Sequence, residues 1–573
     1  MIRGSLSERV GSGVFTERIA LWSLLLILAY LVGTPVAFLI LSSFKPTGLP
    51  PDPGWTLDNY ARAFGDPEFV EVLTNSLVFV AGSVVLAVGV ALVLVLLIER
   101  TDVVGRRPLR WLILLPMAAP PFLIGVSWSL LLSPRSGAVN RILQSWLGYE
   151  EGPLNIFSLG GMVFVEGLVL VPTAYLMLMP AVRAMDPMLE EAALAAGASP
   201  GRVLRTVTLA LLRPAILAAA IFLAIAGFVV FDIPGALGLP GRVFVLSTRI
   251  FILVSEQPLG LPRYGEVAAL GVGLLATLVG LAYAFRLLAR QADRFAVVTG
   301  RSGARRLMHL GRWRNWVSFV PWVYVLMAAA VPLAVLLWTS FLPFVDALGS
   351  DAFNSLTFSN HRALFADSRV AGSVANTLYV AVLSATLVAV LAGLIAWFSG
   401  RARGALAGVV DVLSFAPVSL PGVLLGVALL FVYLTVAALP VYGHLAILVV
   451  AYVTMYLAYG TRAMNGVMAQ LHGDLTAAAA VCGAGMALTL RRVVLPLSLA
   501  GLVAVWSWVF IHAVRELSAA LMLRGTGNTV LTTLLWDYWS GGRGTVAAAM
   551  GVWLVLGMAA VIFIWRIRGA KYG

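Results

Sequence analysis

Five ionisable side chains lie within or at the ends of long apolar runs of the chain. They are Glu166, Asp232, His512, Arg515 and Glu516. Because a membrane interior penalises charge, groups of this kind usually serve transport, and acids at matching ends of two runs would help a cation to cross. We therefore predict that these residues belong to a pathway. The alternative is that they snorkel to the interface, or that Arg515 and Glu516 form a structural pair.

Two loops show a different pattern, in which a short alanine-rich helix precedes a glycine. In the first loop, Asp186 before Pro187 is typical of a helix start. The loop continues with Glu190, Glu191, Ala192, Ala193 and Gly197, and its acids fall in the first turn, where the helix dipole favours them. The second loop contains Asp474 as a candidate cap, followed by Ala477, Ala478, Ala479 and Gly483. Small side chains permit close approach, so both loops are predicted to dock a partner; the alternative is an amphipathic helix lying on the bilayer.

The composition defines the elements that must position these residues. Of 573 residues, 61% are apolar and 11% are charged, whereas soluble domains have about 45–50% and about 25%. The apolar residues fall in blocks of roughly 20, the length that crosses a bilayer as a helix. We therefore predict an all-α polytopic membrane protein.

Charge and ligand content exclude several other classes. The net charge of +13 comes almost wholly from arginine in short loops, which a cytoplasmic loop bias explains better than nucleic-acid binding. The single cysteine, Cys482, excludes an intrachain disulfide. The five histidines are scattered and form no Cys/His cluster, so no metal site is predicted.

Apolar runs between charged or Gly/Pro-rich breaks predict twelve spans. They lie near 19–43, 72–98, 110–132, 158–182, 206–231, 265–288, 316–341, 373–398, 406–437, 444–465, 493–515 and 544–567. Arginine is concentrated in the loops after spans 2 and 4 and in the central connector, which predicts that both termini are cytoplasmic.

The spans form two copies of one pattern. WTLDNYARAF from Trp55 matches LTFSNHRALF from Leu356, and Asn75 matches Asn376, both with an offset of 301 residues; beyond span 3, Gly197 matches Gly483 with an offset of 286. Six spans return each copy to its starting side, so the repeats are parallel, with a pathway expected at their interface. We divide the chain into a cytoplasmic N-terminus (1–18), a first six-span unit (19–288), a basic connector (289–315), a second six-span unit (316–567) and a cytoplasmic C-terminus (568–573).

The two loops share the order EAA, three residues, Gly, nine residues, then an apolar residue, any residue, Leu and Pro. This order resembles the cytoplasmic loop of permease subunits in binding-protein-dependent ABC importers. The first copy has Glu191-Ala192-Ala193, Gly197, Val207 and Leu209, with Ala210 in place of Pro; the second has Gly483, Val493, Leu495 and Pro496, with Ala477 in place of Glu. Because the second loop lacks this acid, the two loops can couple unequally to a partner.

The resemblance implies that each loop is a coupling helix that docks in a groove of an ATPase subunit. Its implied partners are two copies of a cytoplasmic ATP-binding subunit, an extracytoplasmic solute-binding protein and the lipid of a bacterial cytoplasmic membrane. Over its whole length the chain is similar to fused two-unit permeases of ferric-iron importers, with thiamine importers close behind. Ferric iron is therefore the favoured solute, and thiamine, polyamine and phosphonate stay open.

ATP must bind to another chain. A P-loop needs a lysine after glycine, and the only lysines, Lys45 and Lys571, follow Phe44 and Ala570. We expect no directly bound cofactor, ATP on the partner subunit and no enzymatic activity in this chain. One alternative is an ion-gradient-driven secondary transporter, suggested by ERTDVVGRRPLR after span 2; another is a membrane enzyme, but no clustered catalytic residues are seen.

Overall fold

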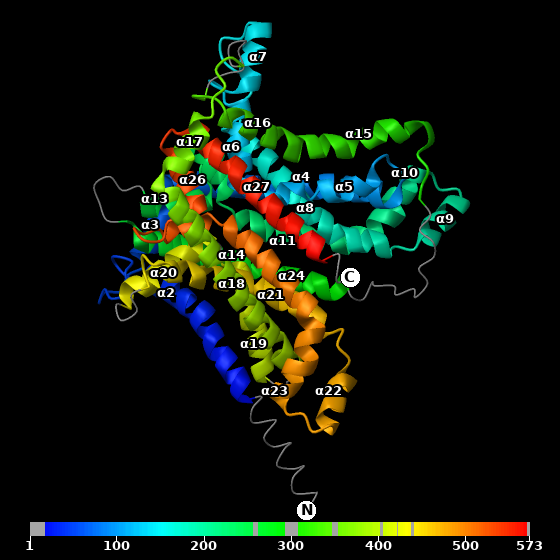
Figure 1. The fold of residues 1–573 in the computed structure, drawn as a ribbon, viewed down its shortest axis with the longest axis vertical. Helices are drawn as coiled ribbons and strands as arrows, with labels where there is room; N and C mark the ends of the chain where they lie inside the picture. The colour runs from blue at the N-terminus through cyan, green and yellow to red at the C-terminus, as the bar shows by residue number, and fades with distance from the viewer. Residues whose placement is uncertain are drawn as a thin grey trace, which may run out of the picture. The chain divides into compact units, whose positions relative to one another are not determined.

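The structure is a computed structural model that describes residues 18–255, 262–292, 307–345, 353–401, 405–420, 422–436 and 441–569. These residues form helices, joined by loops and by one isolated β-bridge between Thr101 and Met308 (Figure 1). Most of the predicted N-terminal segment, connector and C-terminal segment lies outside the described residues, at 1–17, 293–306 and 570–573.

Ten described helices have the length and composition to cross a membrane. They are Arg18–Ser43, which ends in α2 (Thr34–Ser43), α4 (Pro67–Arg100), α8 (Leu159–Ala184), Pro200–Val229, α14 (Tyr264–Ala292), Gly311–Ser340, α18 (Ser368–Arg401), α21 (Leu445–Met468), Met486–Val514 and α27 (Gly544–Gly569). Two broken helices complete the predicted set of twelve, namely Arg106–Ala118 with α6 (Pro121–Leu132), and Ala405–Val418 with α20 (Gly422–Thr435). The all-α polytopic prediction is confirmed.

The break in the third span has a local cause. Its two halves are bent by 91°, and Ala119 and Pro120 between them are extended. Proline lacks the N–H that a helix interior needs, and it pushes the preceding residue out of the helical region. The pair Pro120–Pro121 therefore ends one helix and begins another.

A third broken pair was not predicted. It joins Pro234–Gly241, which contains η4 (Pro234–Gly238), to α13 (Leu246–Ser255) with a bend of 73°. Both halves are shorter than a span, so the apolar pattern predicts only a loop between the fifth and sixth spans. The matching stretch of the second repeat contains two more short helices, α25 (Ser518–Met522) and α26 (Leu531–Ser540).

Three π-helical segments each end two residues before a proline. They are η1 (Ala29–Gly33) before Pro35, η7 (Leu326–Ala330) before Pro332, and η10 (Leu490–Val494) before Pro496. A proline ring clashes with the carbonyl of the preceding turn, and a locally wider turn relieves that clash without ending the helix. The same device thus lies within the first span of both repeats.

The helices form two compact units that interleave along the chain. Unit 1 draws on Met1–Phe64, Leu253–Gly273 and Ser368–Leu534, and unit 2 on Gly65–Ile252, Leu274–Asp367 and Leu535–Gly573. These units do not coincide with the predicted six-span stretches 19–288 and 316–567. The reason is packing, because the first span of each stretch joins the helices of the other.

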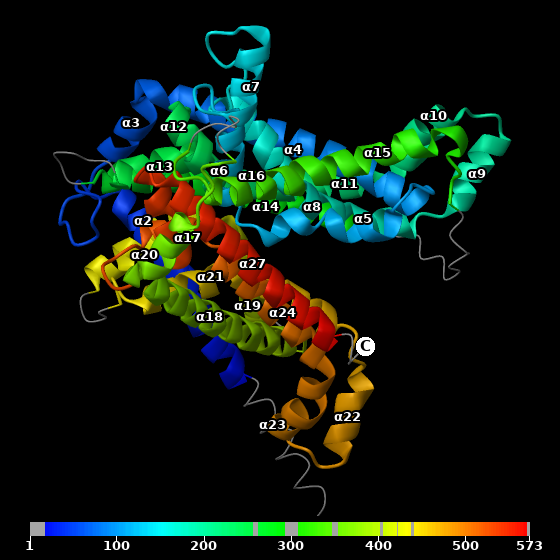
Figure 2. The ribbon, with the colours of Figure 1, turned by 45° about the horizontal axis from the view of Figure 1, so that its top comes forward.

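Each unit contains the same arrangement of helices. In unit 1, α18 packs against α21 and α24 (Leu495–Val514), and α2 packs against α20. In unit 2, α4 packs against α8 and α11 (Leu209–Val229), and α16 (Val331–Ser340) packs against α6. Figure 2 shows α4, α8 and α11 running side by side, with the loop helix α9 (Pro187–Ala195) beyond one end of this bundle.

A repeated Asn-Ser/Thr pair fixes one loop in each unit. Ser76 accepts a hydrogen bond from the backbone N–H of Leu246 at 2.8 Å, and Asn75 donates to the carbonyl of Phe244 at 3.3 Å. In unit 1, Thr377 accepts from Leu531 at 2.8 Å and Asn376 donates to Thr529 at 2.9 Å. The motif that revealed the duplication therefore docks the segment before α13 and before α26.

Candidate coupling loops and buried carboxylates

The first candidate coupling loop begins with a capped helix. The Asp186 carboxylate accepts a hydrogen bond from the backbone N–H of Met188 at 2.9 Å, as predicted, and α9 follows. The chain then reverses at Gly197, whose φ is +86°. A Cβ on Gly197 would meet no atom within 4 Å, so glycine is required for its backbone conformation and not for space.

The second candidate coupling loop has the same form with a different start. Its helix α22 (Gly473–Val481) is followed by Gly483, whose φ is +81°. The prediction that Asp474 caps this helix is wrong, because the helix begins at Gly473, its cap residue is His472, and no side chain there makes a capping bond. Asp474 lies inside the first turn, where its charge still faces the positive end of the helix dipole.

The two loops match element by element. In each, a helix of nine residues leads through the glycine to a helix of four residues and a π-helical segment of five. These are α10 (Pro200–Val203) and η3 (Leu204–Thr208) in the first loop, and α23 (Met486–Thr489) and η10 in the second. The predicted order of short helix, glycine break and second helix that runs into a span is confirmed.

Both loop helices expose apolar side chains. In α9, Met188 is 65% exposed and Leu189 48%, and in α22, Val481 is 89% exposed and Leu475 46%. The exposed members of the predicted coupling set are Glu191, Ala192, Gly197, Asp474, Ala477, Ala478 and Gly483, and Ala193 and Ala479 are half-buried. Exposed apolar groups on a short helix are typical of a docking surface.

Glu190 has an internal role that the sequence did not reveal. It forms an ion pair with Arg100 at the end of α4, and the two side chains are only 15% and 17% exposed. The hydroxyl of Thr208 in η3 donates to the same carboxylate at 2.6 Å. At the offset of 286 residues, Thr476 and Val494 take the places of Glu190 and Thr208. The Glu190 carboxylate therefore ties the first loop to two neighbouring helices, and the second loop has no acid at this position.

The end of the connector is anchored beside this tie. The backbone N–H of Met308 donates to the carbonyl of Arg100 at 2.8 Å. The Asp102 carboxylate accepts from the backbone N–H of Leu310 at 3.0 Å, and the Asp102 carbonyl accepts from Arg314 at 2.8 Å. The hydrogen bond from Leu310 lowers the pKa of Asp102 below its ordinary value, with smaller effects from His309 and Arg314.

We expect Asp102→Ala to speed hydrogen exchange at the Leu310 amide about tenfold at pH 7. Folding lowers the pKa of Asp102, so the ionised carboxylate stabilises the folded state. This stabilisation is fully present above the unfolded pKa of about 3.9 and is lost as the pH falls through the folded pKa. In the wild type, the protection of the Leu310 amide against hydrogen exchange, corrected for the intrinsic exchange rate, should therefore be constant between about pH 5 and 8. His309→Ala is the control, because this side chain is 86% exposed, and an equal effect there would contradict the assignment.

A second charged cluster joins three helices of unit 2. The side chain of Glu99 in α4 is 1% exposed and accepts two hydrogen bonds from Arg110 at 2.9 Å and two from Arg183 at 2.9 and 3.0 Å. Tyr175 adds its hydroxyl at 3.3 Å. In unit 1, the ion pair of Asp411 with Arg462 is longer at 3.6 Å and more exposed, and Gly400 stands in place of Glu99 at the offset of 301 residues.

Glu99→Ala is expected to lower the free energy of unfolding by about 2–3 kcal/mol, measured by denaturation of the purified chain in detergent. The loss leaves two guanidinium groups without their acid, but these are 29% and 31% exposed, so water compensates in part. Asp411→Asn is the matched control and should change the free energy of unfolding by less than about 1 kcal/mol. Equal effects of the two variants would contradict a special role for Glu99.

The five predicted pathway residues fall into two groups. In unit 2, Glu166 on α8 is buried, and the Asp232 carboxylate is close enough to act on it electrostatically. In unit 1, Glu516 accepts hydrogen bonds from the Tyr456 hydroxyl at 3.2 Å and the Ala519 N–H at 3.0 Å. The carboxylate of Glu516 therefore caps the start of α25 and has a structural role.

The two basic members of the set lie near Glu516. The Tyr456 hydroxyl donates to the carbonyl of His512 at 3.2 Å, and the His512 ring bonds to the carbonyl of Trp508 at 2.8 Å. Arg515 acts electrostatically on both Glu516 and His512. The sequence missed Tyr456, although it lies one helical turn after Tyr452, the repeat counterpart of Glu166.

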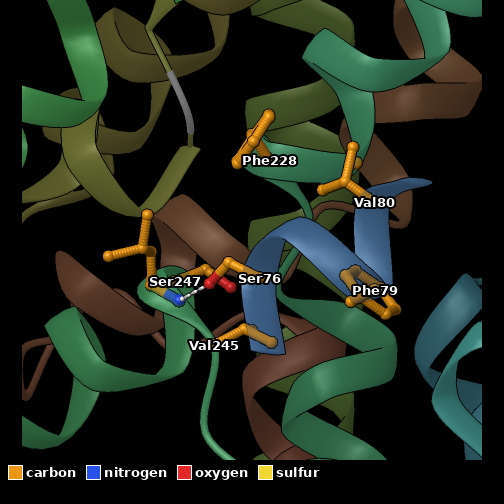
Figure 3. A pocket seen from close by; sticks show the side chains of 8 residues that line it. Ser76, Phe79, Val80, Phe228, Val245 and Ser247 are labelled. Atoms are coloured by element: carbon orange, nitrogen blue, oxygen red, sulfur yellow. Dashed lines mark hydrogen bonds between the residues drawn. The ribbon is translucent and has the colours of Figure 1, made fainter. Parts of the chain in front are cut away.

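A small apolar pocket lies within unit 2 (Figure 3). Its labelled lining residues are Ser76, Phe79, Val80, Phe228, Val245 and Ser247. Ser76 already bonds to Leu246, and the Ser247 hydroxyl donates to the carbonyl of Val230 at 2.7 Å. Because its polar groups are used by the protein, we assign this pocket to packing beside the docked loop.

Comparison with known proteins shows that part of the chain matches one protein family and that the chain is similar to several permeases. Residues 385–567 match the family described as binding-protein-dependent transport system inner membrane component. The ferric transport system permease protein FbpB of Actinobacillus pleuropneumoniae is 24% identical over 96% of this chain and 78% of that protein. The Fe(3+)-transport system permease protein FbpB 2 of Haemophilus influenzae is 21% identical over 87% of this chain and 90% of that protein. The trehalose/maltose transport system permease protein MalF of Thermococcus litoralis is 31% identical over 39% of this chain and 76% of that protein.

The spans and the two matching loops define a transport protein of the membrane. The chain belongs to the family of binding-protein-dependent transport system inner membrane components. It is a permease of an ABC importer in which two permease units are fused, as its length and its whole-chain relatives indicate. Such a permease is not itself an enzyme, since ATP is hydrolysed on a separate subunit.

Proposed function

We propose that this chain forms the translocation pathway of an ATP-driven importer for ferric iron. A solute-binding protein delivers the iron, and two copies of a cytoplasmic ATPase subunit grip the two coupling loops. The observation that carries the proposal is the match between these loops, each presenting a nine-residue helix with exposed apolar groups. Two equivalent coupling loops on one chain provide one docking site for each of two equivalent ATPase subunits.

The mechanism follows from the way each loop helix is connected to a span. Each loop helix leads through its glycine and a short helix into a long span, α11 or α24. Closure of the ATPase pair would move the loop helices, and the attached spans would move with them. Alternation between inward-open and outward-open states needs a difference in binding free energy, which ATP and the loaded binding protein supply.

The solute is proposed from the relatives. Two of them are named ferric permeases, and each aligns with at least 87% of this chain. The relative named for trehalose and maltose aligns with 39%. Similarity over the whole length therefore favours ferric iron as the solute. Thiamine, polyamine and phosphonate are the alternative solutes, and the transport assay distinguishes among them.

The proposal includes an orientation. Arginine-rich loops, among them the loop after α4 with Arg106 and Arg107, lie on the cytoplasmic side, and both termini lie there too. The coupling loops then face the ATPase subunits. A cysteine reagent that does not cross membranes should label Cys482, the exposed cysteine beside Gly483, only from the cytoplasmic side.

The test is reconstitution in proteoliposomes with the ATPase subunit and the binding protein. We expect uptake of radioactive ferric iron that requires ATP, both partners and the purified chain. A proton or sodium gradient without ATP should give no uptake. Uptake driven by a gradient alone would replace this proposal by the secondary-transporter alternative, and ATP-driven uptake of a different solute would correct the substrate.

A further inference from the structure

The short helices α13 and α26 are equivalent elements of the two repeats. Besides the Asn-Ser/Thr bonds that dock the segments before them, both begin with the same internal bond. The backbone N–H of Val245 donates to the hydroxyl of Thr248 at 2.9 Å, and that of Val530 donates to the hydroxyl of Thr533 at 3.1 Å. Both pairs are related by an offset of 285 residues, which fixes the register of the two helices.

Phe251 of α13 and Trp536 of α26 occupy matching positions by this offset, and their rings are in contact. The ring centres lie 5.8 Å apart and the ring planes meet at 72°, which is the favoured edge-to-face arrangement. Parallel repeats are related by a twofold axis along the membrane normal. Equivalent residues lie at equal distances from that axis on opposite sides, so two that touch must lie beside it. The contact therefore marks the axis along which a pathway between the repeats is expected.

Two further rings of the first repeat pack on the same point. The ring centre of Trp536 lies 5.3 Å from that of Phe122, at the start of α6, and 5.7 Å from that of Phe231, which follows α11. Phe231 also contacts Phe251, with ring centres 5.0 Å apart. The three phenylalanines are at most 6% exposed, and Trp536 is half-buried. These four residues, all of unit 2, form what we call the aromatic cluster.

The aromatic cluster is asymmetric, because the first repeat supplies a cage for the tryptophan of the second. A glycine permits this close packing: a Cβ on Gly235 in η4 would lie 2.9 Å from the ring of Phe231 and 3.3 Å from the ring of Trp536. The second repeat has no such cage. At the positions that match Phe122, Phe231 and Gly235 it has Val423, Arg515 and Ala519. Separation of the repeats would therefore withdraw Trp536 from three rings at once.

The aromatic cluster lies at the end of unit 2 that is opposite the first coupling loop. Helix α11 follows that loop directly and has 21 residues, so it spans about 30 Å before the chain reaches Phe231. Figures 1 and 2 both show α13 and the loop helix α9 at opposite ends of α4 and α8. With the coupling loop in the cytoplasm, as proposed, the cluster lies at the outward end of the pathway.

Packed apolar rings on the axis of a pathway exclude water, and an apolar constriction of this kind stops ions and polar solutes. We infer that the aromatic cluster is the outward gate of this permease and that Trp536 is its moving part, which leaves the cage when the pathway opens to the outside. The inference deepens the proposed function and rests on it for the orientation and the solute. The ring contacts stabilise the closed state, so opening requires a ligand that binds the open state better.

The accessibility test uses the full chain with its ATPase subunit in proteoliposomes, and Cys482→Ser removes the native thiol. In this background, Phe251→Cys should react slowly with a membrane-impermeant thiol reagent applied from the outward side. The reaction should become about tenfold faster when the binding protein and a non-hydrolysable ATP analogue are added. Phe79→Cys, which replaces a ring of the packing pocket, should react slowly in both conditions. Equal rates for Phe251→Cys in the two conditions would overturn the inference.

The hydrolysis test uses the same complex without the binding protein. Trp536→Ala should raise ATP hydrolysis about fivefold, because loss of the ring contacts increases the population of the open state. Gly235→Ala should act in the same direction, since its methyl group would press on the rings of Phe231 and Trp536. Trp536→Phe, which keeps a ring, and Trp539→Ala, on the same helix, should stay within about twofold of the wild type. No rise in Trp536→Ala, or an equal rise in Trp539→Ala, would contradict the gate.

Neither readout measures iron, so the gate and the proposed solute fail separately. If the wild-type complex imports no ferric iron but both tests give the expected results, the gate stands and the proposed solute is wrong. If the wild-type complex imports iron while Phe251→Cys reacts equally in both conditions, the gate is wrong and the proposed function stands. Size-exclusion profiles of each variant separate an opened gate from a misfolded chain, and the accessibility test keeps Trp536 in place.

Discussion

Replacing Gly197 and Gly483 together by valine is expected to reduce ATP-driven uptake about 100-fold, and each single replacement about tenfold. Both glycines have φ above +80°, where an L-residue costs roughly 1–2 kcal/mol and a β-branched residue more. The strained turn would rotate the loop helix away from the position in which an ATPase subunit can grip it. Uptake into proteoliposomes and recovery of the ATPase subunit with the tagged chain measure the effect.

Asparagine at the same two positions is the matched control. Asparagine tolerates the left-handed conformation, and an added Cβ would meet no atom within 4 Å of Gly197. Gly197→Asn is therefore expected to keep uptake within about threefold of the wild type. Equal losses with asparagine and valine would show that side-chain bulk, and not backbone conformation, controls docking.

Glu190→Ala is expected to reduce uptake about 10- to 30-fold, because α9 loses its ties to Arg100 and Thr208. Hydrogen bonds to a charged group contribute about 1.5–3 kcal/mol each, and this group is 15% exposed, so most of that value should be retained. The loss should come from the first loop alone. Modification of Cys482 reports on the second loop, and the ATPase subunit should still protect this thiol in the variant.

Charge reversal distinguishes a specific ion pair from a general need for an acid. Arg100→Glu alone should impair uptake as strongly as Glu190→Ala, since it places two acids together at the end of α4. The double variant Arg100→Glu with Glu190→Arg should recover at least about threefold over either single change. No recovery, together with unchanged protection of Cys482, would mean that Glu190 contacts the partner directly.

Local sequence determined the elements of this protein because their signals are short in range. Blocks of about 20 apolar residues can only be satisfied as membrane helices, since the bilayer offers no hydrogen-bond partners to the backbone. The cap at Asp186 and the turn at Gly197 depend on residues next to them in the chain. The repeat itself followed from offsets that can be counted.

Tertiary structure decided which of those elements pack together and which acidic side chains bind other groups of the same chain. The first span of each repeat joins the other repeat's helices, a choice made by surfaces far apart in the sequence, which no local period encodes. Glu190 and Glu191 are adjacent and alike in sequence, yet only Glu190 meets Arg100. Glu166 and Glu516 both follow from an apolar pattern, but only the packed helices show that Tyr456 satisfies one acid while the other faces Asp232. The sequence therefore determined the spans, the loops and the duplication. The fold determined the partner of each charged side chain, because tertiary packing brings together residues that lie far apart in the sequence.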